Sequence, residues 1–139
     1  MDTFQISILA ADHPFYVGPC ESLIVPTVEG EYGIWAHHSN MISAILPGTL
    51  HYKLPGQPML HAAISEGFLK VESNEALVLV DTAERPEEIE INRAKRDADA
   101  AREAILQKKS VEEYHFAQAN LARAINRLRV RRQYYDELE

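Results

Sequence analysis

Residues 76–94 read ALVLVDTAERPEEIEINRA, and within this stretch the sequence changes from a strand pattern to a helix pattern. Leu77 to Val80 is an apolar run of the kind found in a central strand. After Pro86, acidic residues stand where the dipole of a helix favours negative charge, and proline itself is tolerated in a first helical turn. We therefore predict two domains, a β-rich segment of residues 1–84 and a helical segment of residues 85–139.

The two segments also differ in charge. Residues 1–84 contain two basic and ten acidic side chains, for a net charge of −8, whereas residues 85–139 contain twelve basic and eleven acidic ones, for a net charge of +1. From Tyr114 to Tyr135 there is no carboxylate, but there are five arginines: Arg123, Arg127, Arg129, Arg131 and Arg132. A face built for solubility mixes both signs of charge, so this stretch indicates a contact surface for a partner.

The composition excludes several classes of protein. The single cysteine, Cys20, cannot form an internal disulfide or a multi-cysteine metal site. No apolar run approaches 18 residues and no basic-then-apolar leader follows Met1, so we expect neither a membrane span nor a signal peptide. A pI near 5.4 argues against general nucleic-acid binding.

Residues 1–84 read as short strands separated by turns that glycine, proline and asparagine supply. Strands at such regular spacing are typical of a β-sandwich or barrel. The eight strands predicted from the pattern are Phe4–Ala10, Glu21–Val25, Gly33–Ala36, Ile42–Leu46, Thr49–Leu54, Met59–Ile64, Phe68–Glu72 and Ala76–Asp81.

Apolar residues in the second segment recur every three or four positions, as on one face of a helix. The first predicted helix begins near Pro86, and the second follows a turn at Lys108-Lys109, with Ser110 and Glu113 forming a capping box. Helices joined by so short a turn must be antiparallel, and each is on the order of 30 Å long at ~1.5 Å per residue. The apolar positions are Ile91, Ala94, Ala98, Ala101 and Ile105, then Tyr114, Ala117, Leu121, Ala124 and Leu128.

The seam between these helices is rich in alanine. At ~0.8 kcal/mol per buried CH₂, alanines stabilise a seam far less than leucines would. A ligand at about a hundred times its dissociation constant adds ~2.7 kcal/mol to the state it prefers. A small signal could therefore decide whether the hairpin stays folded. On a helical wheel Arg123 and Arg127 project away from the seam, so we expect them to face solvent.

Signals for catalysis and metal binding are poor. Gly30 and Gly33 flank a turn and do not open a helix, so no phosphate-binding glycine loop is predicted. Cys20 has no obvious paired base, and we expect a packed, inert thiol. His37 and His38 are adjacent on a strand and point to opposite faces, which favours a structural or turn role over shared ligation of a metal.

The residues alone leave three classes of function open. These are a regulatory interaction module, a small-molecule enzyme built on a sandwich, and a stand-alone nucleotide-sensing or nucleic-acid-binding helical hairpin. An enzyme should present a pocket of convergent titratable groups, and a nucleic-acid binder should bind any duplex with a steep salt dependence. No motif in the sequence indicates either property.

A set of motifs resembles the epsilon subunit of bacterial F-type ATP synthase, and the resemblance runs almost from end to end. The motifs are Glu29-Gly30-Glu31-Tyr32-Gly33-Ile34, His37, Ala44-Ile45, Pro47-Gly48, Gly67-Phe68-Leu69-Lys70-Val71, Asn74 and Asp81-Thr82-Ala83. The resemblance implies an α+β protein, with an N-terminal β-sandwich of about ten strands followed by an antiparallel two-helix hairpin.

The same resemblance implies a non-catalytic subunit of the rotor's central stalk that couples ion flow to ATP synthesis. Its implied partners are the gamma subunit and the c-subunit ring, at the cytoplasmic face of the cell membrane. The hairpin is expected either to fold down or to extend along gamma toward the catalytic beta subunit, where it inhibits ATP hydrolysis. No cofactor is required, but ATP is a possible regulatory ligand.

Family members that bind ATP carry the motif Ile-Asp-x-x-Arg-Ala, and this chain has Ile89-Glu90-Ile91-Asn92-Arg93-Ala94. A further arginine of the family falls on Ala100 here, with Arg102 the nearest substitute. Glutamate in place of aspartate and the missing arginine both predict weak binding. The implied ATP-site residues are Glu84, Ile89, Glu90, Arg93, Ala94, Arg123 and Arg127, and no catalytic or metal-binding residue is predicted.

Overall fold

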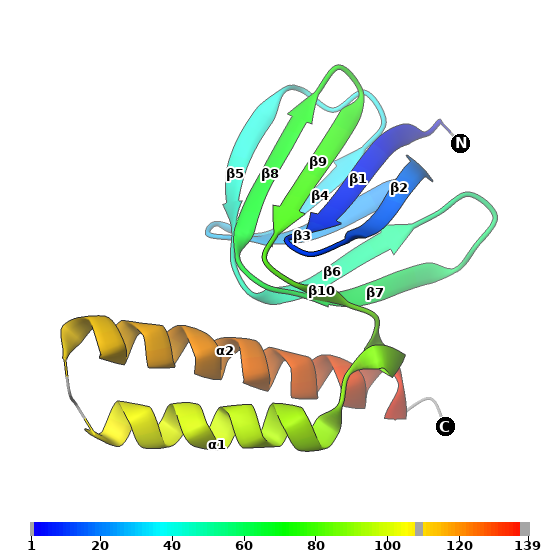
Figure 1. Ribbon diagram of the computed structural model, residues 1–139. Coiled ribbons are helices and arrows are strands. Elements are labelled where there is room, and N and C mark those ends of the chain that lie inside the picture. Colours follow the sequence, from blue (N-terminus) through cyan, green and yellow to red (C-terminus); the bar gives the residue numbers. More distant parts are fainter. Residues whose placement is uncertain (1, 108–109, 137–139) are drawn as a thin grey trace. The chain divides into compact units, whose positions relative to one another are not determined.

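The structure, a computed structural model, describes residues 2–107 and 110–136 and divides into two compact units, Met1–Arg85 and Pro86–Glu139. Within the described residues, the first unit holds ten strands and the second holds a 3₁₀ helix and two α-helices (Figure 1). The predicted fold class, a β-sandwich followed by an antiparallel helical hairpin, is confirmed.

The strands form one continuous sheet that wraps around a single core. Neighbours along the sheet follow the order β10-β7-β6-β3-β5-β8-β9-β1-β2, and β4 pairs with β3. Strands β1 and β9 run parallel, and the other pairs are antiparallel. The bounds are β1 Phe4–Ala10, β2 Pro14–Cys20, β3 Ser22–Thr27, β4 Gly30–Trp35, β5 Met41–Ile45, β6 Gly48–Lys53, β7 Met59–Ile64, β8 Gly67–Glu72, β9 Glu75–Val80 and β10 Ala83–Glu84.

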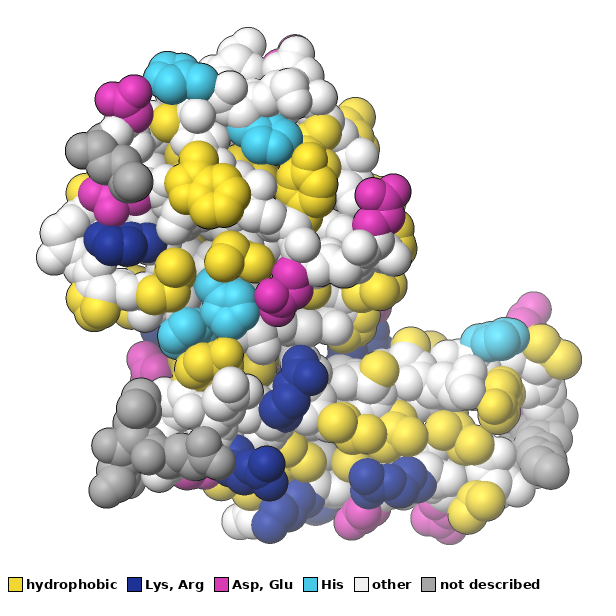
Figure 2. All heavy atoms as spheres, turned by 180° about the vertical axis from the view of Figure 1, so that it is seen from behind, with side chains coloured by type: hydrophobic (Ala, Val, Ile, Leu, Met, Phe, Trp, Pro, Cys, Tyr) yellow, Lys and Arg dark blue, Asp and Glu magenta, His cyan; other side chains and the backbone are white. Residues whose placement is uncertain are grey.

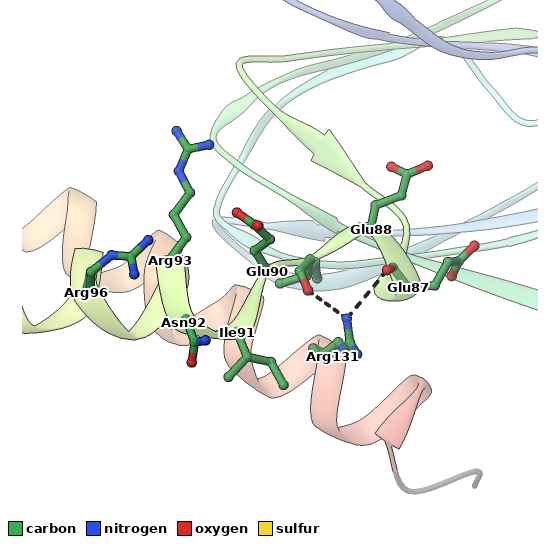
Figure 3. A pocket seen from close by; sticks show the side chains of 9 residues that line it. Glu87, Glu88, Glu90, Ile91, Asn92, Arg93, Arg96 and Arg131 are labelled. Atoms are coloured by element: carbon green, nitrogen blue, oxygen red, sulfur yellow. Dashed lines mark hydrogen bonds between the residues drawn. The ribbon is translucent and has the colours of Figure 1, made fainter.

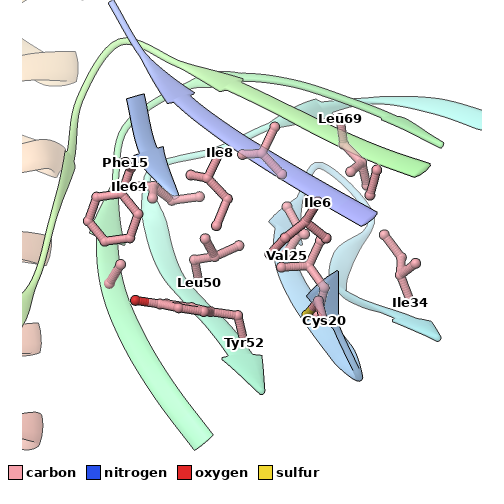
Figure 4. Packing of buried hydrophobic residues seen from close by; sticks show 14 of the residues in the cluster. Ile6, Ile8, Phe15, Cys20, Val25, Ile34, Leu50, Tyr52, Ile64 and Leu69 are labelled. Carbon is pink, nitrogen blue, oxygen red and sulfur yellow. The ribbon is translucent and has the colours of Figure 1, made fainter. Parts of the chain in front are cut away.

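Large apolar side chains fill the core of this unit (Figure 4). Ile6 and Ile8 on β1 are fully buried, as the alternation of apolar and polar residues on this strand predicts. The ring of Phe15 packs edge to face against Tyr52, with ring centroids 6.1 Å apart. Each such side chain stabilises the fold by about 1.5–3 kcal/mol when fully buried, so the unit has a strong core of its own.

Two strands were absent from the prediction, and both lie at edges of the sheet. Strand β2 contains Pro14, Gly18 and Pro19, which the sequence pattern indicates as turn residues. Proline cannot donate to a β-ladder, but an edge strand has an unpaired side that tolerates it, and β2 ends the strand order. Strand β10 is only two residues long, which is too short for any pattern to predict.

The first helix begins later than predicted. Pro86–Glu88 forms a 3₁₀ helix, closed by a hydrogen bond of 3.3 Å from the backbone N–H of Ile89 to the carbonyl of Pro86. Helix α1 spans Ile91–Gln107, and the N–H of Ala94 donates to the carbonyl of Glu90 at 3.0 Å. The acidic residues therefore precede α1 and do not occupy its first turn.

Helix α2 spans Val111–Tyr134, and its predicted cap is present, because the N–H of Glu113 donates to the Ser110 hydroxyl at 3.0 Å. The predicted alanine seam is also confirmed. Its buried alanines are Ala94, Ala98 and Ala101 on α1 and Ala117 and Ala124 on α2. Leu121 and Leu128 are half-buried, and α2 buries Asn126 and Val130 in addition. The predicted turn residues Lys108 and Lys109 lie outside the described residues.

Gly67, at the start of β8, lies against the backbone of β9. A Cβ atom at this position would stand 1.8 Å from the carbonyl oxygen of Leu79, so β9 would have to move. We expect Gly67→Ala to lower the free energy of unfolding by about 3 kcal/mol or more in urea denaturation. Gly56→Ala is the control, because Gly56 has a φ of +73° but open space around it, and it should cost about 1 kcal/mol. Equal losses in the two variants would contradict this prediction.

Candidate functional site

The arginine-rich part of α2 is the most distinctive surface of the helical unit. Figure 2 shows Lys and Arg side chains gathered over this unit, beside hydrophobic side chains. Arg129 and Arg132 are exposed, whereas Arg123, Arg127 and Arg131 are half-buried. The arginines therefore fall into an outward group and a group held within the hairpin.

The prediction that Arg123 and Arg127 face solvent is wrong. The Arg127 side chain is only 19% exposed, and its Nη1 lies 3.4 Å from Oδ2 of Asp97 on α1. Arg123 donates from Nη2 to the side-chain oxygen of Asn120. A wheel gives the direction in which a residue leaves its helix, but a seam of alanines leaves the helices close enough for a long side chain at its edge to reach across.

Arg131 contacts both the segment before α1 and the residues that follow α2. Its Nη1 donates to the carbonyl oxygen of Ile89 at 2.8 Å and lies 3.5 Å from that of Glu87. Its Nε donates to Oδ1 of Asp136 at 3.1 Å, and its guanidinium lies 4.3 Å from the centre of the Tyr135 ring. The sequence did not indicate these partners, because two of them are backbone carbonyls.

A pocket of about 510 Å³ lies where α1 begins (Figure 3). Arg93 and Arg96 project from α1 on one side of it, whereas Glu87 and Glu88 lie on the other side. Arg131 lies on the same side as Glu87 and Glu88. The guanidinium groups of Arg93 and Arg96 offer planar donors that suit phosphate or carboxylate groups. The lining residues are Glu87, Glu88, Ile89, Glu90, Ile91, Asn92, Arg93, Arg96 and Arg131.

The structure brings together three of the predicted ATP-site residues, since Ile89, Glu90 and Arg93 all line this pocket. Ala94 is buried in the helical seam, and Glu84 is half-buried in β10 of the sandwich unit. The other two, Arg123 and Arg127, have the α2 contacts described above and are not among the lining residues.

Arg102 was the predicted substitute for the family arginine that is missing at Ala100, but in the structure Arg96 lies at the pocket instead. Arg102 is exposed and its Nη1 lies 3.4 Å from Oδ1 of Asp99, outside the pocket lining. Arg96, one helical turn after Arg93, lines the pocket instead. A spacing of three residues places both side chains on one face of α1, so helical periodicity could have indicated Arg96.

Cys20 is buried as predicted, and His37 has the predicted turn role, although neither His37 nor His38 lies on a strand. Cys20 is fully buried, and its Sγ donates to the carbonyl of Ser22 at 3.0 Å. Burial raises the pKa of the Cys20 thiol to about 11, so it is protonated and unreactive at neutral pH. His37 sits in a turn with φ of 66°, and its N–H donates to Oδ1 of Asn74 at 2.7 Å.

The sequence analysis missed a second pair of histidines. His51 on β6 and His61 on β7 lie opposite each other, and their Nδ1 atoms are 2.7 Å apart. Burial, together with the nearby His51, lowers the pKa of His61. Among the described residues, no group of three or more His, Cys, Asp or Glu side chains could hold a metal ion. Strand register brings this pair together, and the sequence alone does not give that register.

None of the described helices combines the length and the apolar character that crossing a bilayer requires.

Comparison with known proteins identifies the family. The β-sandwich domain of the ATP synthase delta/epsilon chain matches residues 3–86, and the long α-helix domain of the same chain matches residues 87–131. The ATP synthase epsilon chain of Ruminiclostridium cellulolyticum is 39% identical over 128 residues, which cover 92% of this chain and 95% of that protein. The epsilon chain of Caldanaerobacter subterraneus subsp. tengcongensis is 39% identical over 135 residues, covering 96% of this chain and 97% of that protein.

Solved structures share the fold. The match to the mitochondrial ATP synthase of Euglena gracilis has a TM-score of 0.73 at 21% identity and covers 86% of this chain and 76% of that one. The match to the central stalk and c-ring of the Tetrahymena thermophila mitochondrial enzyme has a TM-score of 0.65 at 10% identity and covers 91% of this chain and 95% of that one. With both domain families and close relatives over almost its whole length, the chain belongs to the ATP synthase delta/epsilon chain family.

Proposed function

We propose that this chain works in the central stalk of the rotor, with the sandwich as a docking unit and the hairpin as a regulatory one. As a family member it is a non-catalytic subunit of the synthase, so its function lies in its contacts. The proposed partners are the gamma subunit and the c-ring, with the beta subunit as a third partner of the extended hairpin. Through these contacts the protein is held at the cytoplasmic face of the cell membrane.

An exposed apolar strip on the sandwich supports the docking role. Phe68 on β8 lies opposite Ala44 on β5 and Leu79 on β9, so the three side chains share one face. Phe68 is 63% exposed and Leu79 44%, and Ile42, two residues before Ala44 on β5, is 74% exposed. Apolar side chains gathered in this way mark a contact site, and we propose gamma as the partner that covers the strip.

Phe68→Asp should weaken binding of the full-length chain to purified gamma by at least about tenfold, because it places a charge in the centre of an apolar contact. Leu106→Asp is the control, since Leu106 is also exposed, at 77% against 63% for Phe68, but lies on α1. Surface plasmon resonance measures both affinities. Unchanged binding of Phe68→Asp would exclude the strip as the docking site.

The amino-acid composition of the hairpin is the main observation that supports the regulatory role. Its seam is rich in alanine, so it opens at lower cost than a seam of leucines, and α2 carries the five arginines without a carboxylate between Tyr114 and Tyr135. We propose that the set of Arg123, Arg127, Arg129, Arg131 and Arg132 includes the contacts that hold the extended state against acidic segments of beta and against gamma, and that the exposed members Arg129 and Arg132 make them. In that state the subunit inhibits ATP hydrolysis.

The outward arginines provide the test of inhibition. Each exposed ion pair contributes only ~0.2–1 kcal/mol, so single substitutions should have small effects. Replacing Arg129 and Arg132 together by alanine should raise ATP hydrolysis by a reconstituted complex severalfold. Lys95 and Arg102, both exposed on α1, give a control double variant with the same loss of charge. If the two double variants hydrolyse ATP at the same rate, the arginines of α2 do not carry inhibition.

The pocket at the start of α1 supports a second proposal, that ATP binds there and stabilises the folded hairpin. We place the base near Ile89 and Glu90 and the phosphates near Arg93 and Arg96, on the basic side of the pocket. Ala94 belongs to the same proposed site through the family motif. Glu84, Arg123 and Arg127 belong to it because they match positions associated with the site in the family, although none of these four residues lines the pocket. Glu87 and Glu88 repel a nucleotide's phosphates, which agrees with weak binding.

Calorimetric titration of the full-length chain with ATP tests this site. Glu90→Asp should tighten binding, because glutamate is one methylene longer and pushes the base outward. Arg93→Ala should weaken binding about tenfold or more, since a charge-assisted hydrogen bond contributes ~1.5–3 kcal/mol. Arg102→Ala is the control and should bind like the unchanged chain. No heat and no shift in thermal unfolding at millimolar ATP would show that this chain has lost the site.

A further inference from the structure

We infer that Arg131 is a positioning residue that fastens the C-terminal end of α2 to the turn before α1 and thereby favours the closed hairpin. Its regulatory meaning rests on the proposed function, in which an open hairpin inhibits. The contact itself rests on the geometry of the described residues alone. It gives Arg131 a role opposite to that of the outward arginines of the same helix.

The geometry of Arg131 joins two segments far apart in the chain. The bond from its Nη1 to the carbonyl of Ile89 spans 42 positions in the sequence, and the longer contact with Glu87 spans 44. Asp136 and Tyr135 hold the guanidinium from the other side, and the side chain is only 21% exposed. A planar guanidinium with several fixed donors suits such a bridge, whereas an ammonium group does not.

The backbone carbonyls that Arg131 contacts lie in the segment just before α1. Glu87 and Ile89 lie in the 3₁₀ helix and the residue after it, just ahead of α1. Carbonyls outside a regular helix need other partners, and a donor from α2 supplies them only while the hairpin is closed. By contrast, Arg129 bonds to Asn126 at 2.9 Å, within its own helix, so its bond survives opening.

Arg131 also links the closed hairpin to the pocket. It lines the pocket together with Glu87 and Ile89, the two residues that it contacts. The wall of the pocket is therefore complete only when the end of α2 is in place. A ligand in the pocket and the Arg131 contacts must then stabilise each other, because each favours the same closed state.

Hydrogen exchange of the full-length chain, followed by mass spectrometry, tests this role. Arg131→Ala should speed exchange of the amides in residues 89–94 and 127–134 by roughly tenfold or more, as expected from losing a hydrogen bond to a charged group. Arg129→Ala removes the same charge from the same helix and should change these rates less than about twofold. Equal exchange in the two variants would overturn the inference.

The Arg131→Lys variant distinguishes the effect of the bridging hydrogen bonds from the effect of the positive charge. Lysine keeps the positive charge but loses the fork of donors, so exchange should be intermediate between that of the unchanged chain and that of Arg131→Ala. If Arg131→Lys matches the unchanged chain, the charge alone suffices and the bridging role is wrong. Because this change is conservative, it also provides a test if Arg131→Ala fails to fold.

The assembled synthase gives a second readout that isolates the proposed function. Arg131→Ala should lower ATP hydrolysis by the complex, whereas the double variant of Arg129 and Arg132 should raise it. Faster exchange with unchanged hydrolysis would support the Arg131 contact and refute inhibition by the open hairpin. Unchanged exchange would refute the Arg131 contact, whatever the hydrolysis rate.

Discussion

The close approach of α1 and α2 through alanine is the constraint on which the behaviour of this protein depends. Short side chains let the helices come near each other, but each contributes little burial, at ~0.8 kcal/mol per CH₂. Ala98 and Ala124 are buried yet add only a methyl group each. The free energy that keeps the hairpin closed must therefore come largely from contacts at the edges and ends of the seam, where Arg127 and Arg131 lie.

Most of α2 lacks carboxylates, and this determines which contacts its arginines make at the edges and ends of the seam. Among the acceptors that these arginines reach are Asp97 across the seam, Asp136 beyond the end of the helix, the amides of Asn120 and Asn126, and the carbonyl of Ile89. Arg129 and Arg132 remain exposed on the closed hairpin. In the proposed function an acidic partner attracts these exposed arginines, so closure and partner binding compete for the same helix.

The sequence predicts the fold well where periodicity is strong and fails where local chemistry is ambiguous. All eight predicted strands are present, because alternation and turn residues report directly on the sheet. Strand β2 was missed because Pro14 and Pro19 mark turns as often as edge strands, and Pro86 was placed in α1 because a 3₁₀ turn and a first helical turn accept the same residues. The family and the motif from Ile89 to Ala94 could be recognised from the sequence. The contacts of Arg131 with Glu87 and Ile89 could not be predicted, because these acceptors are backbone carbonyls that any residue supplies.

The two units divide the work according to how each is stabilised. The sandwich buries large side chains such as Ile6, Leu50 and Leu69 completely, which suits a part that must stay docked while torque passes through the stalk. The hairpin buries chiefly alanine, which suits a part that must leave its resting place. In the function proposed above, an opening signal must break the contact of Arg127 with Asp97 and the contacts of Arg131 with the turn before α1. A ligand at that turn, as proposed above, would favour the closed hairpin without any change in the core of the sandwich.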